Sequence, residues 1–515
     1  MTLLRAAIFA ALCILAPLLA HAQDITLRSQ DGGVELTGTL LGFDGQFYRI
    51  QTRYGELTVD GSGVSCDGVG CPSLIDYVAE LDIVGSATMG RILLPALIEG
   101  FARRGNMTAT REAEDDTHIQ YTLRSGDKTV GRFYVALTNT DAGFAELIDD
   151  RADMVMALRE ITPEENAAAL AAGLGDMTGP HRSRVLALDA MVPIVAPGNP
   201  AAKISLAQLS GVLSGRIDNW QALGGPDAPI TLHLREQGSG LVQGLEQRLI
   251  RPTRGTLTEA RRHDSNQALS DAVARDPFGL GIASFSEIGN AKPLVIGGTC
   301  GFKLSAARRS IKTEDYPLTA PMFLYLPARR LPKLARDFLA YTRSPMAQIV
   351  IRRADFVDQA PEETAIDLQG DRLSNAVRVA AAAGGLEQLQ DMIGALAGKR
   401  RLSLTFRFEA GSSRLDAQSR SNAETLALAL ESGAYDGRVL TFVGFSDGQG
   451  PAPSNLSIAR TRAEAVRDAV LAEAQTADLS RITVETRAFG EAMPMACDDS
   501  SWGRQVNRRV EIWLD

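Results

Sequence analysis

Gly444-Phe445-Ser446-Asp447 closes an apolar run at 438–443 and begins the stretch that decides the fold of this part of the 515-residue chain. Leu456-Ser457-Ile458-Ala459-Arg460 follows and opens a segment with helical periodicity at 457–474. Near the C-terminus, Asn507-Arg508-Arg509-Val510-Glu511-Ile512 leads into an alternating run at 508–514. These stretches predict a strand, a helix and a final strand that share one sheet.

The same periodicities extend outward over 401–515. We predict a strand that starts at Leu402, then a helix at 417–432, a strand at 438–443, a helix at 457–474 and strands at 481–488 and 508–514. The order is therefore β-α-β-α-β-β. Apolar and polar residues alternate in the first and last of these strands, so the first strand is expected to bury one face.

Asp447 and Arg460 are the candidate binding residues of this unit. Asp447 follows the strand at 438–443, and Arg460 lies in the first turn of the predicted helix, so both reach the same sheet edge. A cation near a helix N-terminus opposes the helix dipole at a cost of about 0.3–1 kcal/mol, which favours an anionic partner nearby. The alternative is a solvated helix arginine, which we expect Arg462 and Arg467 to be.

The 401–515 unit resembles the OmpA-like peptidoglycan-binding domain in the three stretches quoted above. This resemblance implies that Asp447 and Arg460 grasp the diaminopimelate of a cell-wall stem peptide, with Asn507 and Arg508 lining the site. A carboxylate beside a guanidinium suits that ligand, which carries an ammonium and a carboxylate close together. Phe445 stands where the family commonly has His. The loop before Leu456 also looks about two residues short.

Residues 76–358 alternate strands with helices, which predicts an α/β domain with parallel pairing. Ser86 and Thr88 fall at a predicted helix N-terminus, and Gly238-Ser239-Gly240 opens another, where free N–H groups attract an oxyanion. Arg235 ends a strand at 230–234 and could add charged hydrogen bonds. Taken singly, each hydroxyl is also explained as a plain helix cap. Their convergence with Arg235 favours an anion site.

This segment resembles the phosphate-type substrate-binding proteins of ABC transporters, which have two lobes and the periplasmic-binding-protein fold. The likeness rests on Leu81–Met89, Ala152–Arg159, Ile204–Leu209, Ser214–Trp220, Arg235–Gly240 and Tyr316–Leu318. It implies an anion site formed by Ser86, Thr88, Arg159, Arg235, Ser239 and Gly240. Two departures leave phosphate and sulfate undistinguished: Leu241 replaces a hydroxyl residue, and Leu158-Arg159 replaces a proton-accepting Asp.

The N-terminus predicts export. Residues 1–22 form a signal peptide, with Arg5, an apolar run and Ala20-His21-Ala22 before Gln23. Turn-separated alternating runs over 23–75 predict a small β module, and 359–400 reads as a helical connector. In an oxidising compartment we expect a disulfide between Cys66 and Cys71. Whether Cys300 and Cys497 meet is left open.

Several function classes are disfavoured. A net charge of −9 argues against a nucleic-acid partner, and no residue pattern supports a nucleophile–base set, a P-loop or a metal site. We therefore expect no enzyme and no cofactor. The sequence predicts a periplasmic oxyanion-binding protein, of phosphate in the first place, held on the peptidoglycan of a Gram-negative bacterium. An ABC transporter permease or another envelope protein is a further candidate partner. The alternative is a wall-anchored scaffold or sensor that has lost transport.

Overall fold

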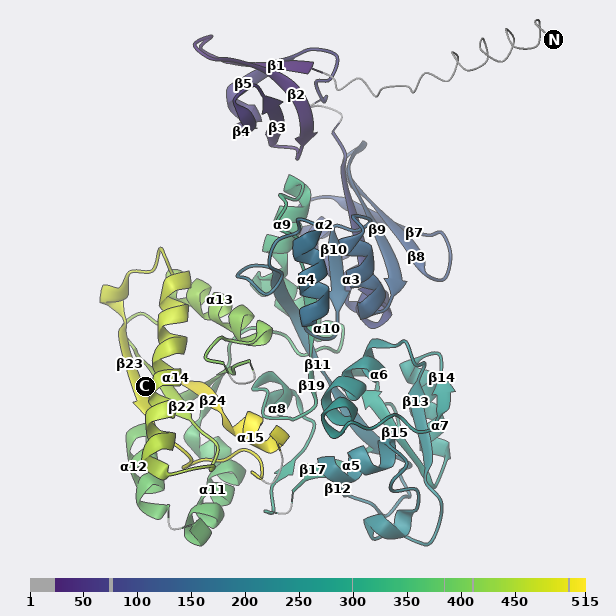
Figure 1. Ribbon diagram of the computed structural model, residues 1–515, viewed down its shortest axis with the longest axis vertical. Coiled ribbons are helices and arrows are strands. Elements are labelled where there is room, and N and C mark those ends of the chain that lie inside the picture. Colours follow the sequence, from purple (N-terminus) through teal and green to yellow (C-terminus); the bar gives the residue numbers. More distant parts are fainter. Residues whose placement is uncertain (1–23, 74–76, 299, 384, 410–411, 499–500) are drawn as a thin grey trace, which may run out of the picture.

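The computed structural model describes residues 24–73, 77–298, 300–383, 385–409, 412–498 and 501–515. The predicted signal peptide, 1–22, lies outside them. Figure 1 shows a small N-terminal sheet, a two-lobed domain and a C-terminal domain that lies beside both lobes. The predicted multidomain fold is confirmed. Among the described helices, none has both the length and the apolar composition needed to cross a membrane.

The N-terminal module is one antiparallel sheet with the order β4-β3-β2-β1-β5. Its strands are β1 (Asp24–Ser29), β2 (Glu35–Phe43), β3 (Phe47–Thr52), β4 (Gly55–Asp60) and β5 (Val64–Asp67). Ile25, Leu27, Tyr48 and Ile50 form its core. Cys66 and Cys71 are joined in a disulfide at the end of β5.

Lobe 1 of the two-lobed domain holds its first strands and the helices that cover them. The strands are β6 (Ala79–Ser86), β7 (Thr108–Ala113), β8 (His118–Ser125), β9 (Lys128–Thr138) and β10 (Met154–Ala157). The helices are η2 (Met89–Leu93), α2 (Leu94–Arg104), α3 (Thr140–Ile148), α4 (Pro163–Ala171), α9 (Lys333–Thr342) and α10 (Pro345–Arg353). The buried apolar side chains of β6, β8, β9, η2, α2, α9 and α10 make one core. Those of α3 and α4 belong to a second core, which continues into lobe 2.

Lobe 2 is built from shorter elements. Its strands are β12 (Lys203–Ser205), β13 (Thr231–Arg235), β14 (Arg261–His263), β15 (Gly279–Ser284), β16 (Lys292–Pro293), β17 (Val295–Gly297) and β18 (Lys303–Leu304). Its helical segments are α5 (Leu206–Leu213), η3 (Trp220–Leu223), α6 (Gly240–Leu245), η4 (Glu246–Ile250), η5 (Arg251–Thr253), α7 (Asn266–Arg275), η6 (Phe285–Glu287) and α8 (Arg308–Lys312). The segment 240–250 is continuous through α6 and η4.

Two strands join the lobes: β11 (Ser183–Val195) and β19 (Thr319–Tyr325). In β11, Val185 pairs with Phe323 of β19, whereas Met191 pairs with Ser284 of β15, so one strand enters both halves. The sheet order is β14-β13-β15-β11-β19-β10-β6-β9-β8-β7. The predicted parallel pairing holds for β6 with β9 and β10, and for β13 with β14 and β15. The joining strands pair antiparallel, because they run back across the sheet.

The C-terminal domain has a sheet with the order β20-β21-β24-β22-β23. Its strands are β20 (Glu363–Ala365), β21 (Arg400–Phe406), β22 (Val439–Phe445), β23 (Thr483–Ala488) and β24 (Arg509–Leu514). Its helices are α11 (Gly370–Ala383), α12 (Leu386–Leu396), α13 (Ala417–Glu431), α14 (Ala452–Glu473) and α15 (Ser501–Asn507). The β-α-β-α-β-β order is present, with β20 and α15 added to it.

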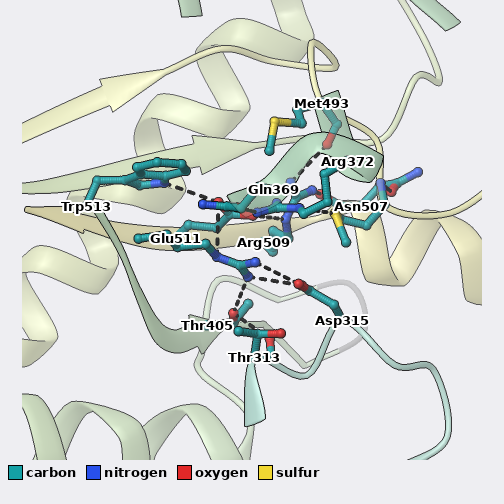
Figure 2. Close-up of polar contacts among 12 residues, drawn as sticks. Thr313, Asp315, Gln369, Arg372, Thr405, Met493, Asn507, Arg509, Glu511 and Trp513 are labelled. Atoms are coloured by element: carbon teal, nitrogen blue, oxygen red, sulfur yellow. Dashed lines mark hydrogen bonds and ion pairs between the residues drawn. The ribbon is translucent and has the colours of Figure 1, made fainter. Parts of the chain in front are cut away.

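The segment expected to be a connector is packed into this domain. Helices α11 and α12 cover one face of the sheet through Val443, Phe445 and Trp513, while α13 and α14 cover the other. Both faces are therefore buried. The polar residues of the last strand are buried with them: Arg509 and Glu511 are 0% exposed. Figure 2 shows the ion pairs that make this burial tolerable.

Helix α14 begins at Ala452, earlier than the predicted start at 457. Pro451 precedes it and Pro453 occupies its first turn, where a proline has no hydrogen-bond partner to lose. Arg460 consequently lies in the third turn. The argument from the helix dipole does not apply to Arg460, because that effect is confined to the first turn.

Candidate functional site

Two neighbouring strands bring Asp447 and Arg508 together in the C-terminal domain. Phe445 at the end of β22 pairs with Arg509 at the start of β24, so the residues just beyond meet at one sheet edge. Arg508 Nη1 donates to Asp447 Oδ2 at 2.7 Å. The Arg508 side chain keeps 32% of its surface exposed and Asp447 keeps 14%. The pair is therefore accessible from one side.

A pocket of about 270 Å³ lies beside this pair. Its lining is Phe408, Glu409, Ser412, Arg462, Gln505 and Arg508. The guanidinium carbon of Arg462 lies 5.5 Å from the centre of the Phe408 ring. Burial lowers the pKa of Arg462, the charge of Arg508 lowers it further, and Asp447 opposes both. The guanidinium groups of Arg462 and Arg508 and the carboxylates of Asp447 and Glu409 thus lie at one opening, where Glu409 is ion-paired with Arg414 and Arg420.

Arg460 is not in that lining. It is exposed on α14, and Arg462 occupies the position that sequence reasoning gave to Arg460. Ala459, Ala463, Val466 and Val470 form the buried stripe of α14. Arg460 and Arg462 flank that stripe on opposite sides, since successive residues turn by about 100°. The helical pattern could have separated the two arginines, but the pattern alone does not say which flank faces Asp447.

Asn507 is close to the pocket but its polar atoms are used elsewhere. Its Oδ1 accepts from the backbone N–H groups of Met495 and Ala496 at 2.6 and 3.0 Å. Its Nδ2 donates to Ala496 O at 2.8 Å and to Asp498 Oδ1 at 2.7 Å. The side chain is fully buried. Asn507 therefore holds the loop before α15 in place rather than facing a ligand.

In the two-lobed domain, the predicted turns do face the junction between the lobes. Ser86 ends β6, and its Oγ accepts from Met89 N at 3.5 Å. Thr88, Leu158 and Gly240 line a cavity of about 20 Å³ between the lobes, together with Asp189. That volume suits about one water molecule. The cavity as it stands does not hold a tetrahedral oxyanion.

Leu158 fills the space in front of α6. Ser239 caps this helix, with its Oγ accepting from Val242 N at 3.4 Å. A Cβ on Gly240 would lie 2.6 Å from Leu158 Cδ1, so the two lobes touch at this point. The backbone of Gly240 approaches closely, as expected, but it approaches an apolar side chain.

Arg159 is paired with carboxylates of its own lobe. Its guanidinium bonds Asp141 and also Glu165, the latter at 2.6 and 2.8 Å. Burial alone would lower the pKa of Arg159, and the two carboxylates raise it overall. Only 8% of the side chain is exposed. These bonds leave Arg159 charge-neutralised within lobe 1.

Arg235 is likewise held within lobe 2. Its Nε donates to His263 O at 3.1 Å, its Nη1 to Asn266 Oδ1 at 2.9 Å and its Nη2 to Asp264 O at 2.7 Å. Burial lowers the pKa of Arg235. The bonds fix the turn after β14 to the end of β13. The predicted anion residues therefore lie near one junction, but both arginines are engaged structurally.

Sequence reasoning missed two features of this junction. Asn139 caps α3, with its Oδ1 accepting from Ala142 N at 2.9 Å, and α3 and α6 together border a polar pocket of about 400 Å³. That pocket is lined by Asn139, Asp141, Ala142, Arg159, Gln237, Gly238, Gln243, Glu246, Gln247 and Arg251. Asp189 is the second feature. Burial raises its pKa to about 6, although hydrogen bonds, including one with Ser284, act to lower it. The strand end at Thr138 followed by Asn139-Thr140 was the available signal for the first.

Comparisons with known proteins match both large domains. The model of the PBP superfamily domain matches residues 78–345, just over half of the chain, and the OmpA family model matches residues 407–508. A phosphate-binding protein PstS of Bacillus subtilis is 31% identical over 166 residues, which are 30% of this chain and 51% of that protein. The PstS of Borreliella burgdorferi is 23% identical over 185 residues, 34% of this chain and 65% of its own length.

Less than two thirds of either relative is thus spanned. Among solved structures, an ABC-type phosphate transport receptor from Vibrio cholerae aligns with a TM-score of 0.42 and 20% identity, over 54% of this chain and 99% of that one. The chain belongs to the PBP superfamily and carries an OmpA family domain at its C-terminal end.

Proposed function

We propose that this chain is a binding protein tethered non-covalently to peptidoglycan in the periplasm of a Gram-negative bacterium. The observation that carries the tether is the Asp447–Arg508 pair, with Arg462 lining the pocket beside it. The disulfides Cys66–Cys71 and Cys300–Cys497 fit an oxidising compartment. The apolar N-terminal segment expected to be a signal peptide supports export.

Asp447, Arg462 and Arg508 together complement the diaminopimelate of a stem peptide. Its ammonium would pair with Asp447, and its carboxylate would take the paired N–H groups of Arg462, with Arg508 at the rim. Planar guanidinium groups bind carboxylates through two parallel hydrogen bonds, which gives geometric selectivity as well as energy. Phe408 would pack under Arg462 and limit its freedom. In this proposal Arg462 takes the role that the sequence alone gave to Arg460.

Binding of the whole protein to purified peptidoglycan sacculi tests the tether. Asp447→Asn and Arg462→Ala should each weaken sedimentation with sacculi by tenfold or more, because loss of one partner of a partly buried charged pair costs about 2–5 kcal/mol. Arg460→Ala is the matched control, an exposed arginine on the same helix, and should stay within twofold of the wild type. A loss with Arg460→Ala alone would reverse the assignment. Failure of the wild type to sediment would end the tether proposal.

For the two-lobed domain, we propose a small oxyanion as ligand, with phosphate as the first candidate. Support comes from the N-termini of α3 and α6, which border one pocket between the lobes. The relatives over this segment are named as phosphate-binding proteins. Arg235 is the last residue of β13, five residues before the start of α6. Uptake would require Leu158 to withdraw from Gly240 as the lobes separate.

The alternative is an anchored scaffold or sensor whose lobes no longer take a transported solute. A specific observation favours it: Leu158 fills the space before α6, while Arg159 is neutralised by Asp141 and Glu165. A wall-bound protein also lacks the free diffusion with which a carrier delivers its cargo. In this reading the envelope partner is a protein.

Calorimetric titration of the full-length protein with phosphate, and then sulfate, separates the two. If the protein binds an oxyanion, the titration should give saturable heat, and Ser239→Ala should lower the affinity by about tenfold. Ser265→Ala is the matched control, because Ser265 caps α7 in the same lobe and its Oγ likewise accepts a backbone N–H three residues on. That variant should bind as the wild type does. The absence of heat with either anion would reject the oxyanion ligand and leave the scaffold.

A further inference from the structure

The C-terminal domain is attached to lobe 1 through helix α13. Val185 N in β11 donates to Ser421 Oγ at 3.2 Å. Glu424, which is 6% exposed, accepts from His181 Nδ1 at 3.0 Å and is ion-paired with Arg343. The first two partners belong to β11 and the loop before it. Arg343 follows α9. Helix α13 therefore contacts two separate parts of lobe 1.

The start of α13 adds two contacts to the same lobe. Ala417 N donates to Glu160 Oε1 at 3.2 Å, just beyond β10. Gln418 Nε2 donates to Gln359 Oε1 at 3.2 Å. Ser421 is therefore buried against β11 of lobe 1, whereas Asn422 is buried against its own sheet and Glu314.

The same domain is attached to the lobe 2 side by a disulfide and buried ion pairs. Cys300, between β17 and β18, is bonded to Cys497 of the C-terminal domain. Arg401 of β21 binds Asp315 through both Nη atoms, at 2.7 and 3.0 Å. Arg407 Nη1 meets Glu314 Oε2 at 3.0 Å. Asp315 and Glu314 lie between α8 and β19, where the chain leaves lobe 2.

A body fixed to both lobes limits the movement between them. Hinged lobes separate by changes at the strands that cross between them, here β11 and β19. Opening would pull Val185 away from α13 or Cys300 away from the C-terminal domain. We propose that the C-terminal domain is a clamp that keeps the two lobes closed, and that the Cys300–Cys497 disulfide is its releasable fastening.

The closed contact that the clamp preserves is visible at Gly240. The Leu158 side chain of lobe 1 lies against Gly240 of lobe 2 with no room for a Cβ. Because close packing of this kind is lost by separations of about 1 Å, the contact reports lobe opening sensitively.

A cavity borders the Cys300–Cys497 disulfide. Cys497 is 8% exposed and lines this cavity of about 320 Å³ between lobe 2 and the C-terminal domain, together with Trp502. A dithiol, as a thioredoxin-like protein or a small molecule, would supply the two electrons and two protons. Its thiolate attacks one sulfur, the Cys300–Cys497 bond breaks, and the second thiolate closes the reductant to its own disulfide. Two free thiols remain on the protein.

Hydrogen–deuterium exchange of the full-length protein, with no ligand added, tests the clamp. In Cys300→Ser/Cys497→Ser, and in wild type treated with dithiothreitol, peptides containing Leu158 and Gly240 should exchange about tenfold faster. The amides of β3 and β22, far from the junction, should be unchanged. Cys66→Ser/Cys71→Ser is the matched control: it removes the other disulfide and should leave the junction as in the oxidised wild type.

A second variant addresses the other attachment. Glu424→Gln removes the charge that pairs with Arg343 and should accelerate the same peptides, whether or not the cysteine variant folds well. Unchanged exchange at Leu158 and Gly240 in both folded variants would overturn the clamp. Faster exchange spread equally over β22 would also overturn it, since that indicates general destabilisation. Neither readout involves oxyanion or peptidoglycan, so the clamp can fail while the proposed function stands, and the reverse.

Discussion

Glu511 is the residue on which the buried polar face of the C-terminal sheet depends. It accepts from Arg509 Nε at 2.7 Å and from Trp513 Nε1 at 3.2 Å, and it is ion-paired with Arg372 and with Arg401. Figure 2 shows this cluster around the carboxylate. Burial opposes its charge, yet the three arginines hold the pKa of Glu511 well below its usual range. One side chain therefore compensates charges contributed by three elements.

Glu511→Gln should destabilise the protein by about 3–5 kcal/mol at pH 7, because it leaves buried guanidinium charge uncompensated. A depressed carboxyl pKa contributes stability that is present above the unfolded value and lost as pH falls, so the variant should also unfold with a weaker acid dependence. Urea unfolding at pH 7 and pH 4 measures both effects. Glu485→Gln, half-exposed on β23, is the control and should change stability by less than about 1 kcal/mol.

At the scale of elements, the position of α14 depends on how closely it approaches β22. A Cβ on Gly444 would lie 2.0 Å from Ala459 O, a backbone atom that cannot yield without moving the helix. This close approach places the buried stripe of α14 on the sheet and turns Arg462 toward Arg508. The glycine after the apolar run thus matters for its small size.

Gly444→Ala should cost about 1–3 kcal/mol by overpacking and should also weaken sedimentation with sacculi, because α14 carries Arg462. Gly394→Ala is the matched control: it lies inside α12 with nothing within 4 Å of the added Cβ. There the substitution should stabilise by about 0.5–1 kcal/mol. Thermal unfolding with the sacculi assay checks the pair. A Gly444→Ala protein of wild-type stability and binding would contradict the close-approach account.

At the scale of the molecule, the interface between α13 and lobe 1 contains a carboxyl group, that of Glu160, whose charged form is disfavoured by burial. Burial raises the pKa of Glu160 to about 7, and the neighbouring Asp416 carboxylate adds to the effect, while Arg420 opposes it. A raised folded-state pKa means that the folded protein binds the proton more tightly than the unfolded chain. Stability from this group is therefore largest at low pH and falls as pH rises toward 7.

Glu160→Gln removes this titration while keeping an acceptor for Ala417 N. The variant should gain about 2–3 kcal/mol relative to the wild type between pH 5 and pH 8.5. Chemical unfolding at the two pH values measures the difference. Glu164→Gln, at an exposed position in α4, should show the same difference from wild type at both pH values. A Glu160→Gln advantage that shrinks with rising pH would contradict the sign.

The sequence by itself determined the domain order and most of the elements. Periodicity identified the β module, the alternating α/β segment and the β-α-β-α-β-β unit, because burial on one face imposes a period on the order of apolar and polar residues. Asp447 could also be placed at the end of its strand, and the resemblance to the OmpA-like domain put Arg508 in the same site. The sequence shows directly which residues adjoin the end of a predicted strand.

Only the tertiary structure decided how those groups are used. It places Arg462, and not Arg460, in the lining of the pocket beside Asp447. It pairs Cys300 with Cys497, and it engages Arg159 and Arg235 with partners within their own lobes. It also buried the alternating polar residues of the last strand beneath α11, against the usual inference from alternation. The physical reason is common to all four: a charged or sulfur-bearing side chain pairs with whatever partner packing brings near. Cys497 for Cys300, and Arg372 for Glu511, lie far away in sequence, where no local pattern records them.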